Sequence, residues 1–182
     1  MRSELQEVIE DFERARARLR QLAATIEATR WFERPDPARW SAGECVIHLN
    51  RTGEAFLPLL HEGLERAKRL QPLGARRLRR DPIGWLLWRI MPPPVRLRTG
   101  TASRFVPASG GDPVEVLATF ERLQDEQVAC AAAARGLPID RVKLTSPFNA
   151  RVRYNLYAAL GILPRHQHRH LWQAEQVVRA LR

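Results

Sequence analysis

Hydrophobic residues recur every three to four positions over four long stretches of the chain, which predicts four amphipathic helices. These stretches are Ser3–Thr29, Ser41–Leu70, Asp112–Gly136 and Asn155–Leu181. In the first, the apolar face carries Leu5, Val8, Phe12, Leu19, Leu22 and Ile26. No stretch alternates between apolar and polar residues as strands do. We therefore expect an all-α four-helix bundle.

Start and stop signals flank three of these helices. "SAGE" at residues 41–44 reads as a capping box, in which Ser41 and Glu44 satisfy each other's backbone N–H groups. Asp112 before Pro113 and Asn155 before the last helix are further expected caps, and Gly136 is an expected stop.

Two prolines fall inside predicted helices. Pro58 predicts a kink in the second helix, and Pro164 predicts either a kink or a restart in the fourth.

A long irregular connection, Gln71–Gly111, separates the second and third helices and holds six prolines. Within it, "PIGWLLWRIM" predicts a short helix whose Trp85 and Trp88 need an apolar surface to cover. Eleven of the 30 Lys and Arg residues lie between Arg66 and Arg104, where Asp81 is the only acidic residue. This basic stretch fits either a solvated loop or a surface for an anionic partner.

Length and composition narrow the class of protein. The 182 residues suit one domain spanning residues 1–182. No apolar run approaches the roughly 20 residues of a membrane-spanning helix, and the N-terminus shows no signal-peptide pattern. Two cysteines form no disulfide framework, so we expect a cytoplasmic protein. No aromatic-interleaved basic motif is present, and we expect no specific nucleic-acid binding.

The segment "LPRHQHRHLWQ", residues 163–173, contains three of the five histidines. On a helix, His166 and His170 lie about 40° apart and can share one metal ion, whereas His168 points to nearly the opposite side. A zinc-protease helix requires HExxH, with a glutamate as general base. Gln167 occupies that position and cannot take a proton, which excludes the protease interpretation.

A metal site of the catalytic type needs a third protein ligand. The candidates are His48 and His61, both in the second helix. His48 lies on the apolar side of that helix, where a hydrogen-bonded core histidine is the alternative interpretation. His61 lies beside Glu62 in the charged end of the helix, where we expect it to be exposed.

Two segments of the chain that contain these histidines resemble a known family. "WSAGECVIHLNRTGEAF", Trp40–Phe56, followed by "HQHRHLWQAEQV" is similar to the DinB-like superfamily of four-helix bundles, in motif order and over nearly the whole chain. The resemblance implies a divalent metal, usually nickel or zinc, held by His48, His166 and His170. The family includes thiol-dependent S-transferases, mycothiol-dependent isomerases and proteins described as metal-dependent hydrolases. The basic Gln71–Gly111 connection is longer than this family leads us to expect.

Two further residues are candidates for the chemistry. Glu44 lies one turn before His48, and it either caps the helix or acts catalytically, orienting the imidazole or serving as a base. Gln173, one turn beyond His170, is a candidate to hydrogen-bond a bound water or a histidine nitrogen.

These observations lead to one functional expectation and two alternatives. We expect a metal-dependent transferase or hydrolase that acts on a small molecule, with a low-molecular-weight thiol as a candidate substrate and a homodimer as the assembly. The first alternative is a non-catalytic protein that engages an anionic partner or a membrane surface through residues 76–98. The second is a structural protein that keeps the metal site without turnover.

Overall fold

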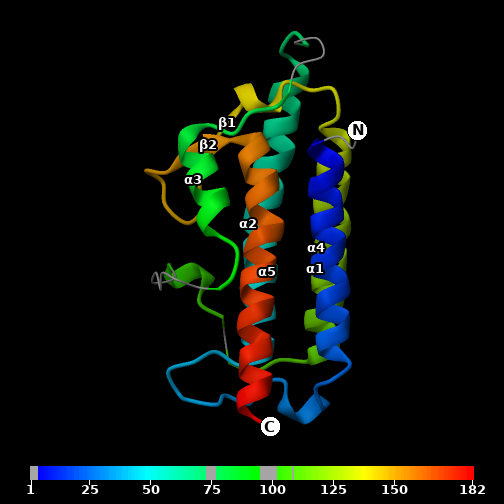
Figure 1. The fold of residues 1–182 in the computed structure, drawn as a ribbon, viewed down its shortest axis with the longest axis vertical. Helices are drawn as coiled ribbons and strands as arrows, with labels where there is room; N and C mark the ends of the chain where they lie inside the picture. Colours follow the sequence, from blue (N-terminus) through cyan, green and yellow to red (C-terminus); the bar gives the residue numbers. More distant parts are fainter. Residues whose placement is uncertain (1–3, 73–76, 95–101, 108) are drawn as a thin grey trace.

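The computed structural model describes residues 4–72, 77–94, 102–107 and 109–182. Four long helices form a bundle: α1 (Glu4–Ala23), α2 (Ala42–Lys68), α4 (Pro113–Ala133) and α5 (Leu156–Ala180). Both α1 and α2 pack against α4 and α5, so α1 and α2 occupy diagonal corners (Figure 1). The expected all-α bundle is confirmed.

Side-chain caps start the helices where the sequence indicated. At α2, Glu44 N–H donates to the Ser41 hydroxyl over 3.1 Å, and Ser41 N–H donates to the Glu44 carboxylate over 2.7 Å. Asp112 caps α4, and Asn155 caps α5 by accepting from the N–H of Ala158. After α4, Gly136 adopts a φ of 75°, a left-handed conformation that favours glycine.

The first helix is shorter than predicted, and Ser3 lies outside the described residues. α1 ends at Ala23 because Thr25 turns the chain: its backbone N–H and its hydroxyl both donate to the carbonyl of Leu22. A 3-10 turn, η1 (Ala28–Arg30), follows before the chain enters α2. The hydrophobic repeat of the sequence extends past the end of α1 to Ile26, because the Ile26 side chain still packs on the hydrophobic core.

Neither internal proline divides its helix. Pro58 lies inside α2, and Pro164 is buried inside α5, which runs without restart from Leu156 to Ala180. Of the two alternatives predicted for Pro164, a kink or a restart, the restart is therefore excluded. Packing of α5 against α1, α2 and α3 maintains the helix despite the missing N–H.

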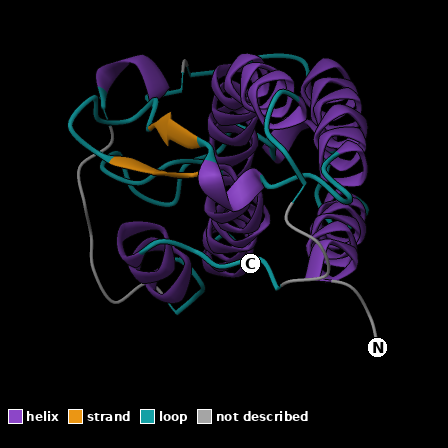
Figure 2. Cartoon of the chain, turned by 90° about the horizontal axis from the view of Figure 1, so that it is seen from above, coloured by secondary structure: helices purple, strands orange, loops and turns teal. Residues whose placement is uncertain are grey.

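A small antiparallel sheet was missed by the sequence analysis. β1 (Lys143–Thr145) pairs with β2 (Arg153–Asn155), with Leu144 opposite Tyr154, and both of these side chains are buried. Each strand has three residues, too few for an alternating pattern to stand out. The sheet lies at the side of the bundle, after the 3-10 turn η3 (Ile139–Arg141) (Figure 2).

The long connection between α2 and α4 contains the predicted short helix, α3 (Pro82–Ile90), and a 3-10 turn, η2 (Ser103–Phe105). α3 packs against α5 and β2 on one side of the bundle (Figure 1). Part of the basic stretch, Arg76, Arg96 and Arg98, lies outside the described residues. No helix in the described ranges is long and apolar enough to cross a membrane.

Candidate metal centre

Two helices bring three histidines together. His48 comes from the second turn of α2, and His166 and His170 come from consecutive turns of α5. Their ligand nitrogens all lie within 4.8 Å of one another. Among the described residues this is the one group of histidine, cysteine and carboxylate side chains with the proximity that a metal ion requires.

The spacing of the nitrogens fits an ion of zinc size. Nε2 of His48 lies 3.4 Å from Nε2 of His166. Two nitrogens bound to one tetrahedral ion at about 2.0–2.1 Å are themselves about 3.3–3.4 Å apart. This pair therefore needs little movement to share an ion.

Hydrogen bonds fix the tautomer of two of the rings. Nδ1 of His48 lies 2.9 Å from the carbonyl oxygen of Phe105, and Nδ1 of His170 lies 3.1 Å from Oε1 of Gln173. Both oxygens only accept, so each Nδ1 carries the proton and each Nε2 presents a lone pair. This is the arrangement that orients histidine ligands in metalloproteins. Of the two contacts considered for Gln173 from the sequence, a bound water or a histidine nitrogen, the structure shows the one to a histidine nitrogen.

The third ring has no such support. Nδ1 of His166 is buried and makes no hydrogen bond with any described residue. A buried nitrogen without a partner costs about 1–3 kcal/mol, and groups of this kind concentrate at functional sites. The orientation of His166 therefore depends on packing and on whatever binds its Nε2.

The histidines favour the neutral form. His48 and His166 are only 2% and 8% exposed. Burial lowers the pKa of His48, and burial together with repulsion between neighbouring rings lowers the pKa of His166 well below 6.5. Burial likewise lowers the pKa of His170 well below 6.5. Neutral imidazole is the form that binds a metal, so the site can bind an ion at neutral pH without first losing protons.

Aromatic rings enclose the cluster. Trp40 lies 5.1 Å from His48 and 6.0 Å from His170, centroid to centroid. Phe148 lies 5.7 Å from His166 and packs on Phe105 at 4.3 Å. An apolar wall of this kind limits water and strengthens electrostatic interactions inside the site.

Glu44 pairs with two residues that precede α2. Both of its carboxylate oxygens pair with the guanidinium of Arg34, and one also accepts from the backbone of Ser41. Burial alone raises the pKa of Glu44, but the hydrogen bonds from Arg34 and Ser41 outweigh burial and hold the pKa below its ordinary value. These contacts stabilise the start of the helix that carries His48. The catalytic role suggested for Glu44 stays a prediction.

The remaining histidines lie outside the cluster. His168 points away from the other two histidines of α5, as helical geometry predicted, and its Nε2 lies 3.2 Å from Asp11 of α1. His61 lies beside Cys130, with Nδ1 4.0 Å from the sulfur. Of the two candidates for the third ligand position, the structure brings His48 and not His61 to the pair on α5.

Phe105 was not recognised from the sequence as part of the site. It lies in the irregular connection, and its backbone carbonyl makes the contact to His48. A carbonyl leaves no signature in the sequence, so only the fold reveals this contact. Gln167, which excluded the protease motif, is buried and forms hydrogen bonds with Gln124 of α4.

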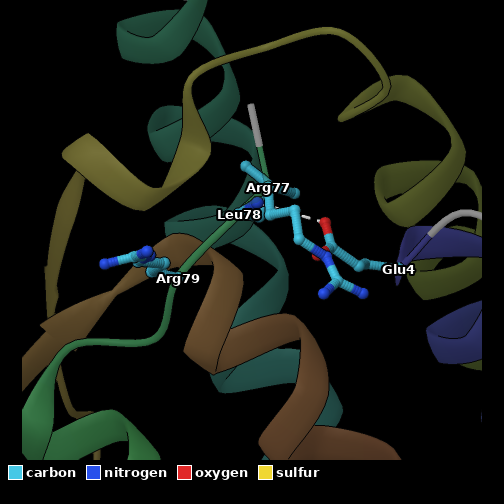
Figure 3. Close-up of a pocket in the computed structure, with 4 residues that line it drawn as sticks. All are labelled: Glu4, Arg77, Leu78 and Arg79. Atoms are coloured by element: carbon cyan, nitrogen blue, oxygen red, sulfur yellow. Dashed lines mark hydrogen bonds and ion pairs between the residues drawn. The ribbon is translucent and has the colours of Figure 1, made fainter. Parts of the chain in front are cut away.

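The hollow lined by Glu4, Arg77, Leu78 and Arg79 is a separate feature (Figure 3). It lies near the N-terminus of α1, at the opposite end of the bundle from the C-terminus of α5 (Figure 1). Glu4 accepts from the backbone N–H of Leu78 and pairs with Arg77 there. The hollow is unconnected with the histidines.

Comparison with known proteins agrees with this geometry. The sequence model of the DinB superfamily matches residues 11–174, a range that contains all three clustered histidines. No curated protein and no solved structure matches the chain. Because the match covers most of the chain and the bundle presents a three-histidine group that can hold a metal ion, the protein belongs to the DinB superfamily.

Proposed function

We propose that this protein is a metal-dependent enzyme that holds zinc or nickel through His48, His166 and His170 and acts on a small molecule. The observation that carries the proposal is the convergence of three imidazoles within 4.8 Å. Hydrogen bonds at two of the rings leave Nε2 free to bind. A divalent ion held by neutral imidazoles lowers the pKa of bound water towards about 7, or binds a thiol as thiolate.

The residues around the cluster favour thiol transfer over hydrolysis. Hydrolysis of most substrates uses a general base near the nucleophile. Within the described residues, no carboxylate completes the histidine group, and the carboxylate of Glu44 is engaged by Arg34 and Ser41. A thiol has an ordinary pKa of about 8.5, so at the ion it would release its proton to solvent and would need no such base, whereas bound water would stay partly protonated near pH 7. We therefore propose a low-molecular-weight thiol as one substrate.

The chain's own residues have defined tasks in this proposal. The carbonyl of Phe105 and Oε1 of Gln173 keep the protons on Nδ1 of His48 and His170. Trp40 and Phe148 exclude water from the histidines and provide an apolar wall for the substrate. The expected homodimer is also part of the proposal.

Elemental analysis of protein purified without a histidine tag tests the ligand set. We expect one equivalent of zinc or nickel, and we expect His48→Ala, His166→Ala and His170→Ala each to lose the metal. His61→Ala and His168→Ala are matched controls that should retain it, since both residues lie outside the cluster. Full metal content in His166→Ala would overturn the assignment.

The reaction is tested by following consumption of small thiols in the presence of an electrophile, before and after removal of the metal. Glu44→Gln should keep the metal and the turnover number if Glu44 only caps α2. A loss of turnover with metal content and folding unchanged would instead establish Glu44 as a catalytic residue.

A further inference from the structure

The outer face of α3 is almost entirely apolar. Among the described residues, four of the seven large hydrophobic side chains that are exposed belong to this nine-residue helix. They are Ile83 (48% exposed), Trp85 (53%), Leu86 (52%) and Ile90 (46%). With 100° per residue, these four and Arg89 share the half of the helix that faces away from the bundle. Clustered exposed apolar residues of this kind mark an interaction site.

The helix is fixed to the bundle by its other face. A Cβ on Gly84 would lie 2.3 Å from Cβ of Ala158, so α3 packs almost backbone to backbone on α5. The ring of Trp88 contacts the guanidinium of Arg80 at 4.3 Å and that of Arg165 at 3.6 Å. The apolar outer face therefore cannot rotate inward without breaking this packing.

Positive charge lies on α3 and on the segments next to it. Three arginines are exposed there. Arg79 lies just before the start of α3, Arg89 lies on the outer face of α3, and Arg153 lies in the neighbouring strand β2. Asp81 is the only acidic residue between Arg66 and Arg104, and its carboxylate caps α3 and pairs with Lys143. Arg89 forms no ion pair with any described residue. Figure 3 shows Arg79 pointing away from Glu4, which pairs with Arg77 instead.

The positive charge around α3 indicates which partner its apolar outer face can bind. A second copy docked about a two-fold axis on α3 would bring the same arginines face to face, in a chain with a formal net charge of +10. An anionic bilayer instead complements both features: Trp, Leu and Ile enter the headgroup boundary, and arginines bind lipid phosphates. Nine residues are too few to span a bilayer, so the helix would lie on the surface.

We propose that α3 docks this protein on an anionic phospholipid surface, with Ile83, Trp85, Leu86 and Ile90 inserted and Arg89 at the phosphates. The surface is narrower than the residues 76–98 considered from the sequence, since it is confined to one described helix. It is independent of the metal proposal, because none of these residues belongs to the histidine cluster.

Vesicle binding tests the lipid and the helix together. The full chain is sedimented with vesicles of phosphatidylcholine and phosphatidylglycerol in equal parts, and with vesicles of phosphatidylcholine alone. We expect binding to the mixed vesicles only, weakening as salt is added. Tryptophan emission should shift to the blue, and Trp85→Phe should bind but lose most of that shift. Trp85 is more exposed than the other four tryptophans, so its surroundings change most.

Paired variants locate the binding surface. Arg89→Ala should weaken binding about fivefold, the equivalent of about 1 kcal/mol for one basic residue at the surface. Leu86→Ser combined with Ile90→Ser should weaken it by about tenfold or more. Matched controls on α4 are Arg122→Ala and Val114→Ser, the latter at a residue that is 72% exposed. Both controls should bind as the parent protein does.

Three results would overturn the proposal. One is equal binding to phosphatidylcholine alone, and another is equal weakening in the α4 controls. The third is a loss of self-association in the Leu86 and Ile90 variant, measured by analytical ultracentrifugation, which would show that a second copy covers α3. Circular dichroism of each variant verifies that the bundle is intact.

Discussion

At the scale of single residues, hydrogen bonds at the ring nitrogens decide what the histidines can do. The carbonyl of Phe105 and the amide oxygen of Gln173 each hold a proton on Nδ1, so Nε2 of His48 and Nε2 of His170 each present a lone pair. His166 has no such partner at Nδ1. The three histidines are therefore not equivalent, since hydrogen bonds orient two of the rings and packing orients the third.

Gln173→Leu should weaken metal binding about 10- to 100-fold while leaving folding intact, because His170 loses the acceptor that fixes its ring and tautomer. Competition with a fluorescent chelator measures the affinity. Gln176→Leu is the matched control, since Gln176 lies on the same helix three residues further from the cluster. An unchanged affinity in Gln173→Leu would contradict a positioning role.

The sequence placed several of these residues correctly. His166 and His170 followed from the 3.6-residue repeat, and His168 was correctly assigned to another face. Gln173, a candidate to hydrogen-bond a bound water or a histidine nitrogen, contacts Nδ1 of His170, and its catalytic role stays a prediction. The contact of Phe105 with His48 could not be predicted from the sequence, because it is made by a backbone carbonyl and every residue type has one.

At the scale of elements, local signals predicted the long helices well. The Ser41–Glu44 box, the Asp112 cap and the Asn155 cap all formed, because each needs only residues two or three positions apart. The predictions of secondary structure were wrong where tertiary contacts determine whether a helix continues or a strand forms. α1 ended early at a turn made by Thr25, and the short strands form a sheet only because Leu144 and Tyr154 are buried together.

The docking of α3 on α5 leads to a prediction at Gly84. Replacing glycine by alanine usually stabilises a helix by about 1 kcal/mol. Here Gly84→Ala should destabilise the protein by about 1–3 kcal/mol, because the new Cβ would meet Ala158 at 2.3 Å and force α3 outward. Urea unfolding measures the change in the free energy of unfolding. Ile83→Ala, on the exposed face of α3, is the control. A gain in stability would show that α3 is not held against α5.

At the scale of the whole molecule, burying three neutral imidazoles links folding to pH. In the metal-free protein, burial lowers the pKa values of His48, His166 and His170 below 6.5. In the unfolded chain they take up protons near pH 6.5. Below that pH the unfolded state binds more protons than the folded state, so acidification favours unfolding.

We therefore expect the free energy of unfolding, measured in urea with a chelator present, to fall as the pH is lowered from about 7 to about 5. Each histidine contributes at most about 1.4 kcal/mol per pH unit, or roughly 4 kcal/mol for three. The decrease continues until the pH passes through the lowered folded-state pKa values. Replacing one ligand, as in His166→Gln, should reduce the slope. A flat profile between these pH values would contradict neutral burial.

The sequence by itself determined the helices, their caps and the pairing of His166 with His170, because these depend on residues within one or two turns of each other. The tertiary structure decided between the candidates His61 and His48, because it brings Nε2 of His48, 118 residues away in the sequence, to 3.4 Å from Nε2 of His166. It also decided that Phe105 orients that ring and that α3 turns an apolar face outward. Such convergence depends on how α2 and α5 pack, and packing is set by side chains from every helix at once.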